Sequence, residues 1–101
     1  MFYTFHQNNT GGSWAGPAHY VIIEADSARE ANDIAEDHGL YFNGCALGHD
    51  CSCCGDRWYE VDEHDADKTP LIYGDHPDEA TEWCTKYNSN SKVKPYIIIW
   101  K

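Results

Sequence analysis

The stretch HYVIIEADSAREANDIAEDHG (residues 19–39) decides the fold, because it predicts a strand that runs directly into a helix. Residues 19–25 are rich in β-branched and aromatic side chains, which is typical of a buried strand. Ser27 and Glu30 have the spacing of a capping box at a helix start, and Gly39 suits the position just beyond a helix end. This unit therefore predicts a strand packed beside the helix that follows it.

The helix expected over residues 27–38 has one apolar face, made mostly of alanine. Small side chains let a helix lie close against a sheet. The residues that share this face are Ala28, Ala31, Ile34 and Ala35. We predict that Ala31 and Ile34 are buried, and that Asp33 and Glu36 on the opposite face are exposed.

Outward from this unit, apolar runs predict further strands and polar, glycine-containing runs predict the connections. The expected strands are residues 2–5, 57–61, 71–74 and 92–101, and a second helix is expected over residues 75–87. The order is about β-β-α-β-β-α-β, which predicts an α+β fold with a small, mainly antiparallel sheet and two helices on one face. Residues 1–101 suffice for one domain.

The final strand contains an unbroken apolar run, YIIIW (residues 96–100). Such a run is typical of a strand that is covered on both faces. Pro95 has no N–H to donate, so it belongs at the beginning of the strand or on an edge. We therefore predict that residues 96–100 are buried and paired on both sides.

The charge of the chain is strongly acidic and unevenly distributed. The formal net charge is −10, and all 17 acidic residues lie between Glu24 and Glu82. Most of the lysines lie near the end of the chain. An acidic surface repels nucleic-acid backbones and anionic membranes, so direct binding to either is not expected. Such a surface is either a well-solvated exterior or a face that binds a basic protein, as a mimic of DNA would.

The sequence has no features of a secreted or membrane protein. No basic region followed by an apolar run opens it, and no run approaches the roughly 20 apolar residues of a membrane span. Its five cysteines are an odd number, and two of them are adjacent at Cys53 and Cys54. This is not a secreted disulfide framework. We expect a cytoplasmic protein.

The run CALGHDCSCCGDRW (residues 45–58) is the densest group of candidate functional side chains. Cys51 and Cys54 have the C-x-x-C spacing that supplies half of a tetrahedral zinc site. Cys45 is the most natural third ligand, and His49 or Cys84 would complete the site, although no second regular pair follows. The other candidate ligands are Cys53 and His64. Zinc is therefore one interpretation of this run.

A second interpretation is a loop braced by buried thiols, which presents Arg57 and Trp58 beside Asp56. Arginine offers a planar charged fork and tryptophan a large stacking face. Neighbouring residues on a strand point to opposite faces, so Trp58 in the core and Arg57 paired with an aspartate is an equally good alternative. A catalytic cysteine would need an adjacent base and an oxyanion pocket, and no signature of these is present. We expect no enzymatic activity.

The run QNNTGGSW (residues 7–14) predicts a polar, glycine-containing loop. Its amides and backbone N–H groups suit the capture of a polar ligand, and an aromatic ring in it could stack on a base. The candidate ligand-binding residues in this loop are Asn8, Asn9, Gly11, Gly12 and Trp14. The same composition also fits a simple connecting loop, and no phosphate-binding glycine motif is present.

Three stretches, MFYTFHQNNTGG, HYVIIEADSAREAN and CSCCGDRWYE, resemble a family of small uncharacterised proteins of tailed bacteriophages. The resemblance covers about the first 60 residues. It implies an accessory protein in the cytoplasm of an infected bacterium, and it transfers no activity. Phage accessory proteins of this size commonly bind and block host machinery or immune signals.

These observations predict a non-enzymatic counter-defence protein that binds a host immune component. The first hypothesis is capture of a small nucleotide-type signal by the polar loop with Arg57 and Trp58. The alternative is an acidic inhibitor of a basic host enzyme or defence effector. A third interpretation is a structural or adaptor module braced by zinc.

Overall fold

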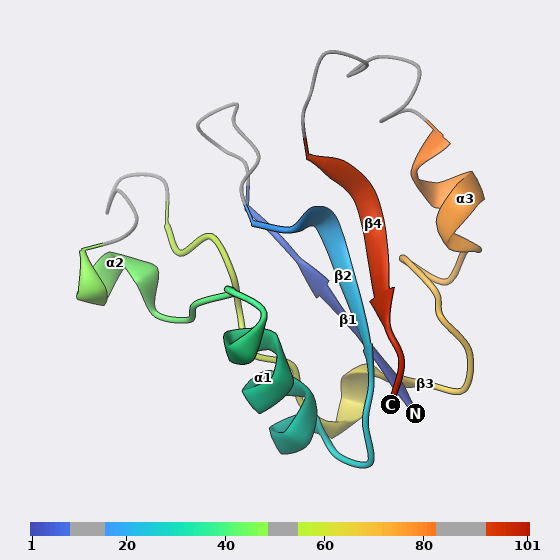
Figure 1. Ribbon diagram of the computed structural model, residues 1–101, viewed down its shortest axis with the longest axis horizontal. Helices are drawn as coiled ribbons and strands as arrows, with labels where there is room; N and C mark the ends of the chain where they lie inside the picture. Colours follow the sequence, from blue (N-terminus) through green and yellow to red (C-terminus); the bar gives the residue numbers. More distant parts are fainter. Residues whose placement is uncertain (9–15, 49–54, 83–92) are drawn as a thin grey trace.

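The computed structural model describes residues 1–8, 16–48, 55–82 and 93–101, and its strands form a four-stranded sheet. The elements of the first half are β1 (Phe2–His6), β2 (Ala18–Glu24), α1 (Ala28–Asp37) and α2 (Gly44–Leu47). Those of the second half are a 3₁₀ turn (Glu63–Asp65), β3 (Ala66–Asp67), α3 (Pro77–Ala80) and β4 (Lys94–Ile99). Figure 1 shows the sheet between α1 and α3.

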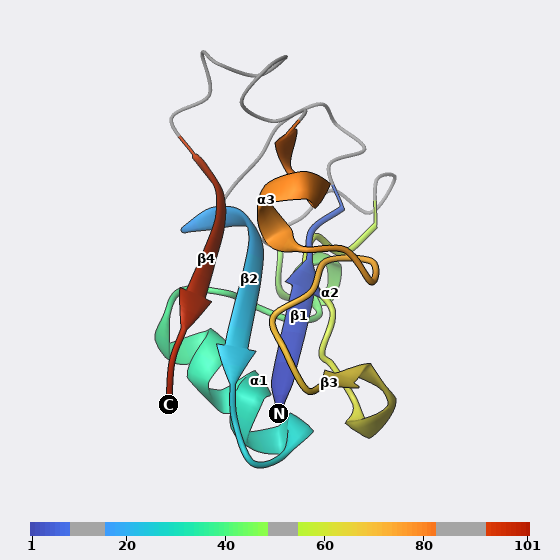
Figure 2. The ribbon, with the colours of Figure 1, turned by 90° about the vertical axis from the view of Figure 1, so that its right-hand side faces the viewer.

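The strands lie in the order β3-β1-β2-β4, as Figure 2 shows from the side of α3. β1 is antiparallel to both β2 and β3, whereas β2 and β4 are parallel. Phe5 of β1 lies opposite Val21 of β2, and Val21 lies beside Ile97 of β4. The predicted α+β class with a mainly antiparallel sheet is confirmed.

Helix α1 begins and ends as its sequence predicts. The Ser27 side chain accepts a hydrogen bond from the Glu30 N–H at 3.1 Å. Gly39 has a φ of 96°, which glycine adopts without a steric cost, and it follows the helix directly. Ala31 is buried, Ile34 is half-buried against the core, and the two carboxylates predicted to be exposed are exposed.

The two faces of the sheet carry different layers, which corrects the prediction of two helices on one face. Tyr3 and Val21 point into the core that α1 covers. Phe2 and Ile22 point to the other face, where they contact Ile72. The chain from residue 69 through α3 covers that second face (Figure 1). Both faces of the central strands are apolar, so each face needs its own cover.

Residues 57–61 do not form the predicted strand. Within them only Trp58 makes bridges, one to Gln7 and one to Phe42. The strand that joins the edge of β1 is instead Ala66–Asp67, in a segment predicted to be a turn. A 3₁₀ turn capped by Asp62 directly precedes this short strand.

The second helix, α3, begins at Pro77 within the predicted segment and covers Pro77–Ala80 among the described residues. His76 precedes it as the N-cap and accepts a hydrogen bond from the Asp78 N–H at 3.2 Å. Thr81 is buried behind it and donates to the Pro77 carbonyl at 2.6 Å. Residues 83–87 of the predicted helix lie outside the described residues.

The last strand is not central, which corrects the prediction for residues 96–100. Among the described residues β4 pairs with β2 alone, and none of its six residues is buried. β2 has β1 on its other side, so β4 receives only the outer position. Tyr96 and Ile98 face the α3 side of the sheet, and Ile97 faces the α1 side.

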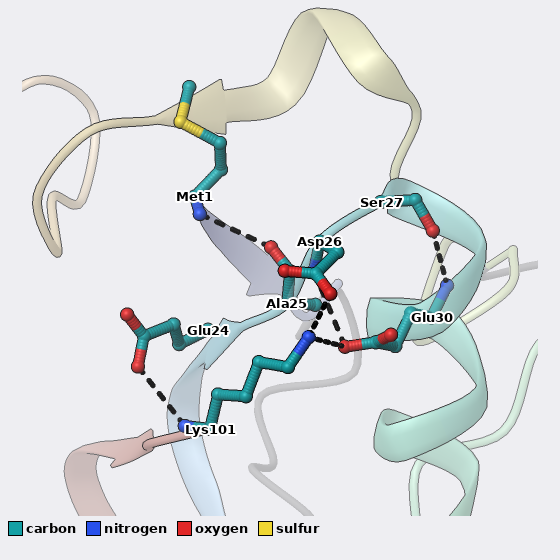
Figure 3. A network of polar contacts seen from close by, with 7 residues as sticks. All are labelled: Met1, Glu24, Ala25, Asp26, Ser27, Glu30 and Lys101. Atoms are coloured by element: carbon teal, nitrogen blue, oxygen red, sulfur yellow. Dashed lines mark hydrogen bonds and ion pairs between the residues drawn. The ribbon is translucent and has the colours of Figure 1, made fainter.

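The two ends of the described chain meet beside the start of α1 (Figure 3). The Met1 ammonium donates to the Ala25 carbonyl at 3.2 Å. The Lys101 ammonium forms ion pairs with Asp26 and, at 3.1 Å, with Glu30. The hydrogen bond and charge of Lys101 lower the pKa of the Asp26 carboxyl. These contacts tie the end of β4 to the turn between β2 and α1.

His6 lies at the end of β1, against two tyrosine rings. Its ring centroid is 4.4 Å from that of Tyr73 and 5.5 Å from that of Tyr20. The Nδ1 atom is buried and has no hydrogen-bond partner. Burial lowers the pKa of His6 below its usual 6.5, although the charge of Asp65 acts in the opposite direction. The folded protein therefore favours the neutral ring.

This lowered pKa predicts a stability that depends on pH. In the unfolded chain His6 takes up a proton at a higher pH than in the folded protein. The free energy of unfolding should therefore fall as the pH drops below about 6.5, until the folded histidine also becomes protonated. His19, whose pKa is lowered by burial, should add to the same slope.

Urea unfolding between about pH 7.5 and about pH 5.5 measures this slope. The His6→Gln variant should show a shallower slope than the natural chain. Leu47→Gln, at an exposed position without a titrating group, should leave it unchanged. An equally steep slope in the His6→Gln variant would contradict the assignment.

Candidate functional site

The sequence predicts eleven candidate site residues, of which the structure describes four: Asn8, Cys45, Arg57 and Trp58. The others lie outside the described residues: Asn9, Gly11, Gly12, Trp14, His49, Cys51 and Cys54. The four described residues belong to the region where β1 ends and the chain approaches α2. The structure thus places the described residues of both candidate motifs in one region.

Trp58 is fully buried in the core between the sheet and α1. Its ring also lies directly beneath Gly16, where a Cβ atom would come within 3.0 Å of the Trp58 Cζ2. In the part of the chain that the structure describes, no group accepts a hydrogen bond from its buried Nε1 atom. Because the ring is enclosed, it offers no face on which a ligand could stack, and the core alternative from the sequence describes it correctly.

Arg57 and Asn8 are brought together by the backbone. The Asn8 N–H donates to the Arg57 carbonyl at 2.8 Å. The Arg57 guanidinium donates to the Gln7 Oε1 at 3.0 Å, and the Gln7 amide in turn donates to the Ala18 carbonyl at 2.9 Å. A buried glutamine is thus one partner of the arginine, and the predicted pairing of Arg57 with an aspartate stays a prediction. Arg57 remains half-exposed beside Asn8.

Asp56 holds α2 against this region. Its Oδ1 accepts a hydrogen bond from the Cys45 N–H at 2.8 Å. Cys45, at the start of α2, is half-exposed. The other three zinc ligands predicted from the sequence lie outside the described residues, and the described residues alone contain no group of three metal-binding side chains. Zinc stays a prediction, which native mass spectrometry of the purified protein would check.

A groove of about 460 Å³ lies between α1 and the chain that precedes the 3₁₀ turn. Five carboxylates line it and one arginine accompanies them: Asp33, Glu36, Glu60, Asp62, Glu63 and Arg29. The floor is formed by Asn32 and Val61. The Asn32 amide donates to the Val61 carbonyl at 3.0 Å and accepts from the Val61 N–H at 2.9 Å. This pair of bonds fixes the two walls of the groove to each other.

Glu63 fixes one end of the groove. Its Oε1 accepts from the Ala28 N–H at 2.8 Å, and its Oε2 accepts from the Tyr3 hydroxyl at 3.0 Å. A carboxylate at this place is favoured by the positive end of the α1 dipole. Burial, and then the bond and charge of Glu63, raise the pKa of Tyr3. Glu63 therefore serves mainly to hold the 3₁₀ turn against α1.

Asn32 and Glu63 are not among the site residues predicted from the sequence. Asn32 did carry a signal, because it is a polar residue next to Ala31 on the buried side of an amphipathic helix. Buried polar side chains need a hydrogen-bond partner, so the sequence could predict that Asn32 bonds to another segment, but not to which one. Glu63 carried no such signal, since its two partners are 35 and 60 residues away.

A second groove, of about 500 Å³ and mostly apolar, lies on the opposite face of the sheet. One wall is β4 with the following Trp100, and the other is the chain around Leu71 and Pro77. The Tyr96 hydroxyl reaches across from β4 to Asp78 of α3 at 2.5 Å. Trp100 is 63% exposed and contacts Phe2 edge to face.

The fold and these two grooves define a small α+β protein with an acidic groove on one side of its sheet and an apolar groove on the other. No helix among the described residues is long and apolar enough to cross a membrane. The chain belongs to the family described as Domain of unknown function (DUF7296), whose model matches residues 1–99. No curated protein and no solved structure matches it.

Proposed function

We propose that this protein is a non-enzymatic accessory protein of bacteriophages, which acts in the cytoplasm of the infected bacterium by binding a host component. The target that the geometry favours is a host protein with a basic surface, such as a nuclease or a defence effector. The observation that carries this proposal is the acidic groove between α1 and residues 60–63. The phage setting is supported by the sequence resemblance.

The groove suits a basic partner because its carboxylates lie on a rigid frame. Asp33 and Glu36 come from α1, and Glu60 and Asp62 come from the opposite wall. The Asn32–Val61 bonds hold these walls together, so little conformational freedom is lost on binding. Side chains of lysine or arginine entering from a partner would meet carboxylates on both sides.

The net charge of −10 would attract a basic partner before the two proteins touch. A field of one sign draws an oppositely charged partner toward the surface and speeds association. Salt screens this attraction, with a Debye length of about 10 Å at 0.1 M ionic strength. Affinity for a basic host protein should therefore fall steeply as salt is added.

Recovery of partners from host lysate on the immobilised protein tests this proposal. We expect a basic host protein to be retained at about 50 mM salt and released at about 500 mM salt. The Glu36→Gln/Glu60→Gln double variant should retain at least about tenfold less of it. Glu79→Gln/Glu82→Gln is the matched control, because it removes the same charge outside the groove. Equal loss in both variants, or no retained protein at low salt, would contradict the groove as the binding site.

A second candidate target, a small nucleotide-type immune signal, is favoured by the Arg57–Asn8 pair at the end of β1. A half-exposed guanidinium held by Gln7 beside an amide is a suitable contact for a phosphate or a base edge. The Trp58 ring is buried, so stacking of a base on this ring no longer supports the nucleotide candidate. Thermal unfolding in the presence of cyclic nucleotides or ADP-ribose tests this candidate. We expect one of these ligands to raise the melting temperature of the natural chain and to have no effect on the Arg57→Ala variant. No change in melting temperature with any of them would count against this candidate.

A further inference from the structure

The apolar groove beside β4 has the size and the lining of a small-molecule site. Its volume is about 500 Å³, and ligand pockets in proteins typically enclose about 300–1,000 Å³. Such pockets are lined mostly by apolar and aromatic side chains. Tyr96, Ile98 and Trp100 form one wall of this kind, and Pro70 and Leu71 belong to the other. The groove therefore has room for one small ligand.

The β4 wall of the groove is continuous with the core of the α3 face. Tyr96, Ile98 and Trp100 alternate along the chain, so they share one face of the strand and its extension. Tyr96 and Ile98 pack against the buried side chains of Phe2 and Ile72. A ligand in the groove would therefore lie against ordered, well-packed side chains.

The Trp100 ring is the most exposed part of this wall. The side chain is 63% exposed, and its centroid is 5.4 Å from that of Phe2. The two ring planes are 87° apart, so Phe2 contacts the indole edge to face and covers at most one of its faces. Flat aromatic rings stack favourably on an indole face of this kind. Trp100 thus offers a platform for a planar ligand.

Contacts at both ends of the wall hold this platform in place. At one end the Tyr96 hydroxyl donates to Asp78 Oδ1 at 2.5 Å, which joins β4 to α3. At the other end the Lys101 N–H donates to Glu24 Oε1 at 3.1 Å, and the Lys101 ammonium pairs with two carboxylates near the start of α1 (Figure 3). Because Trp100 lies between these contacts, little conformational freedom is lost when a ligand binds.

The lining of the groove favours an uncharged ligand. None of the described residues that line it is an aspartate, glutamate, lysine or arginine. The His76 ring lines the groove and accepts from the Asp78 N–H through Nδ1, as a neutral histidine does. An ion in the groove would lose its water without meeting an opposite charge. An anion would also be repelled by the net charge of −10.

We infer that the apolar groove binds an uncharged, flat aromatic small molecule whose ring stacks on Trp100. The rest of the ligand contacts the apolar side chains of the two walls, chiefly Ile98 and Leu71. This inference goes beyond the proposed function, because it uses neither the acidic groove nor the Arg57–Asn8 pair. A nucleotide does not fit this ligand class, since its phosphates are charged.

A fluorescence titration with N-phenyl-1-naphthylamine, an uncharged aromatic probe that emits strongly in apolar surroundings, tests the inference. We expect saturable binding of one probe per chain. Three naphthalene derivatives then compete with the probe: the uncharged 1-naphthalenemethanol, the anion 1-naphthoate and the cation 1-naphthylmethylammonium. Naphthalenemethanol should displace the probe at an at least about fivefold lower concentration than either ion, because only the ions lose hydration of a charge.

Nuclear magnetic resonance of the ¹⁵N-labelled natural chain locates the bound probe. N-phenyl-1-naphthylamine should shift the indole N–H signal of Trp100 and the backbone N–H signals of Tyr96 and Ile98. The indole N–H of Trp58 is the internal control, because that ring is buried in the core on the α1 side of the sheet. Its signal should stay in place.

A pair of variants at exposed apolar side chains tests the role of the Trp100 ring. Trp100→Ala should raise the dissociation constant of the probe at least about tenfold, because it removes the stacking face. Leu47→Ala is the matched control in α2, where Leu47 is 64% exposed, and it should leave the constant unchanged. Circular dichroism shows whether each variant is folded, and the resonance shifts of the natural chain decide the question if Trp100→Ala is not.

Four results would overturn the inference. They are the absence of saturable probe binding, resonance shifts confined to residues outside the groove, displacement of the probe by either ion as readily as by naphthalenemethanol, and an unchanged dissociation constant in a folded Trp100→Ala variant. None of these results affects the retention of a basic host protein by the acidic groove, so this inference and the proposed function can fail separately.

Discussion

Replacement of Trp58 with alanine is expected to lower the free energy of unfolding by about 3–5 kcal/mol. The Trp58 ring is fully buried among residues of β1, β2 and α1, so its removal leaves a cavity that all three elements border. A domain of this size is typically stable by about 5–15 kcal/mol, so the variant should be partly or wholly unfolded. Urea unfolding followed by circular dichroism measures the loss.

Two further variants separate lost packing from other effects of the change. Trp58→Phe keeps much of the ring volume and removes the Nε1 donor, whose burial without a partner costs about 1–3 kcal/mol. It should therefore be clearly more stable than Trp58→Ala. Tyr59→Ala, at a neighbouring side chain that is 57% exposed, should change stability by less than about 0.5 kcal/mol. A similar small change for Trp58→Ala would show that this ring is not a core residue.

Replacement of Asn32 with alanine is expected to cost about 2–4 kcal/mol. The Asn32 side chain satisfies both backbone polar groups of Val61, and all of these atoms are buried. Alanine would leave the Val61 N–H and C=O without partners and remove the contact that joins the two walls of the acidic groove. Asn32→Asp should also be destabilising, because its carboxylate can accept from the Val61 N–H but cannot donate to the Val61 carbonyl.

Chemical denaturation of Asn32→Ala beside Asp33→Ala is the measurement, because Asp33 is the exposed neighbour on the same helix. Asp33→Ala should be close to neutral for stability. Equal stability of the two variants would mean that the Asn32–Val61 bonds do not hold the groove together. Reduced partner binding by Asn32→Ala at a temperature where it remains folded would show that the groove walls must stay fixed.

The α1 helix and the strand before it were predictable because their signals are local. The Ser27 cap, the alanine face and Gly39 each act within one turn of the helix, and the structure contains all three. Trp58 was predictable only as one of two alternatives. Neighbouring side chains in an extended segment point to opposite faces, so Trp58 and Arg57 were expected to point in opposite directions. This alternation does not say which of the two side chains points into the core.

The contacts of the candidate sites needed the tertiary structure. Gln7 and Arg57 are 50 residues apart, and no pattern in either segment indicates that a glutamine orients the guanidinium. The acidic groove likewise combines α1 with residues 60–63, and nothing in the pattern of either segment indicates that they meet. Side chains that meet across such separations are selected by packing, which a pattern within one segment does not encode.

By itself the sequence determined the α+β class, the acidic charge and the start and end of α1, because propensity, capping and alternation act over a few residues. The tertiary structure decided which face of the sheet α3 covers and where β4 lies. The run of isoleucines indicates that both faces of β4 are covered, but it does not specify the position of β4 in the sheet, and β1 occupies the other side of β2. Competition among strands for positions in one sheet is a property of the whole chain, so only the assembled fold resolves it.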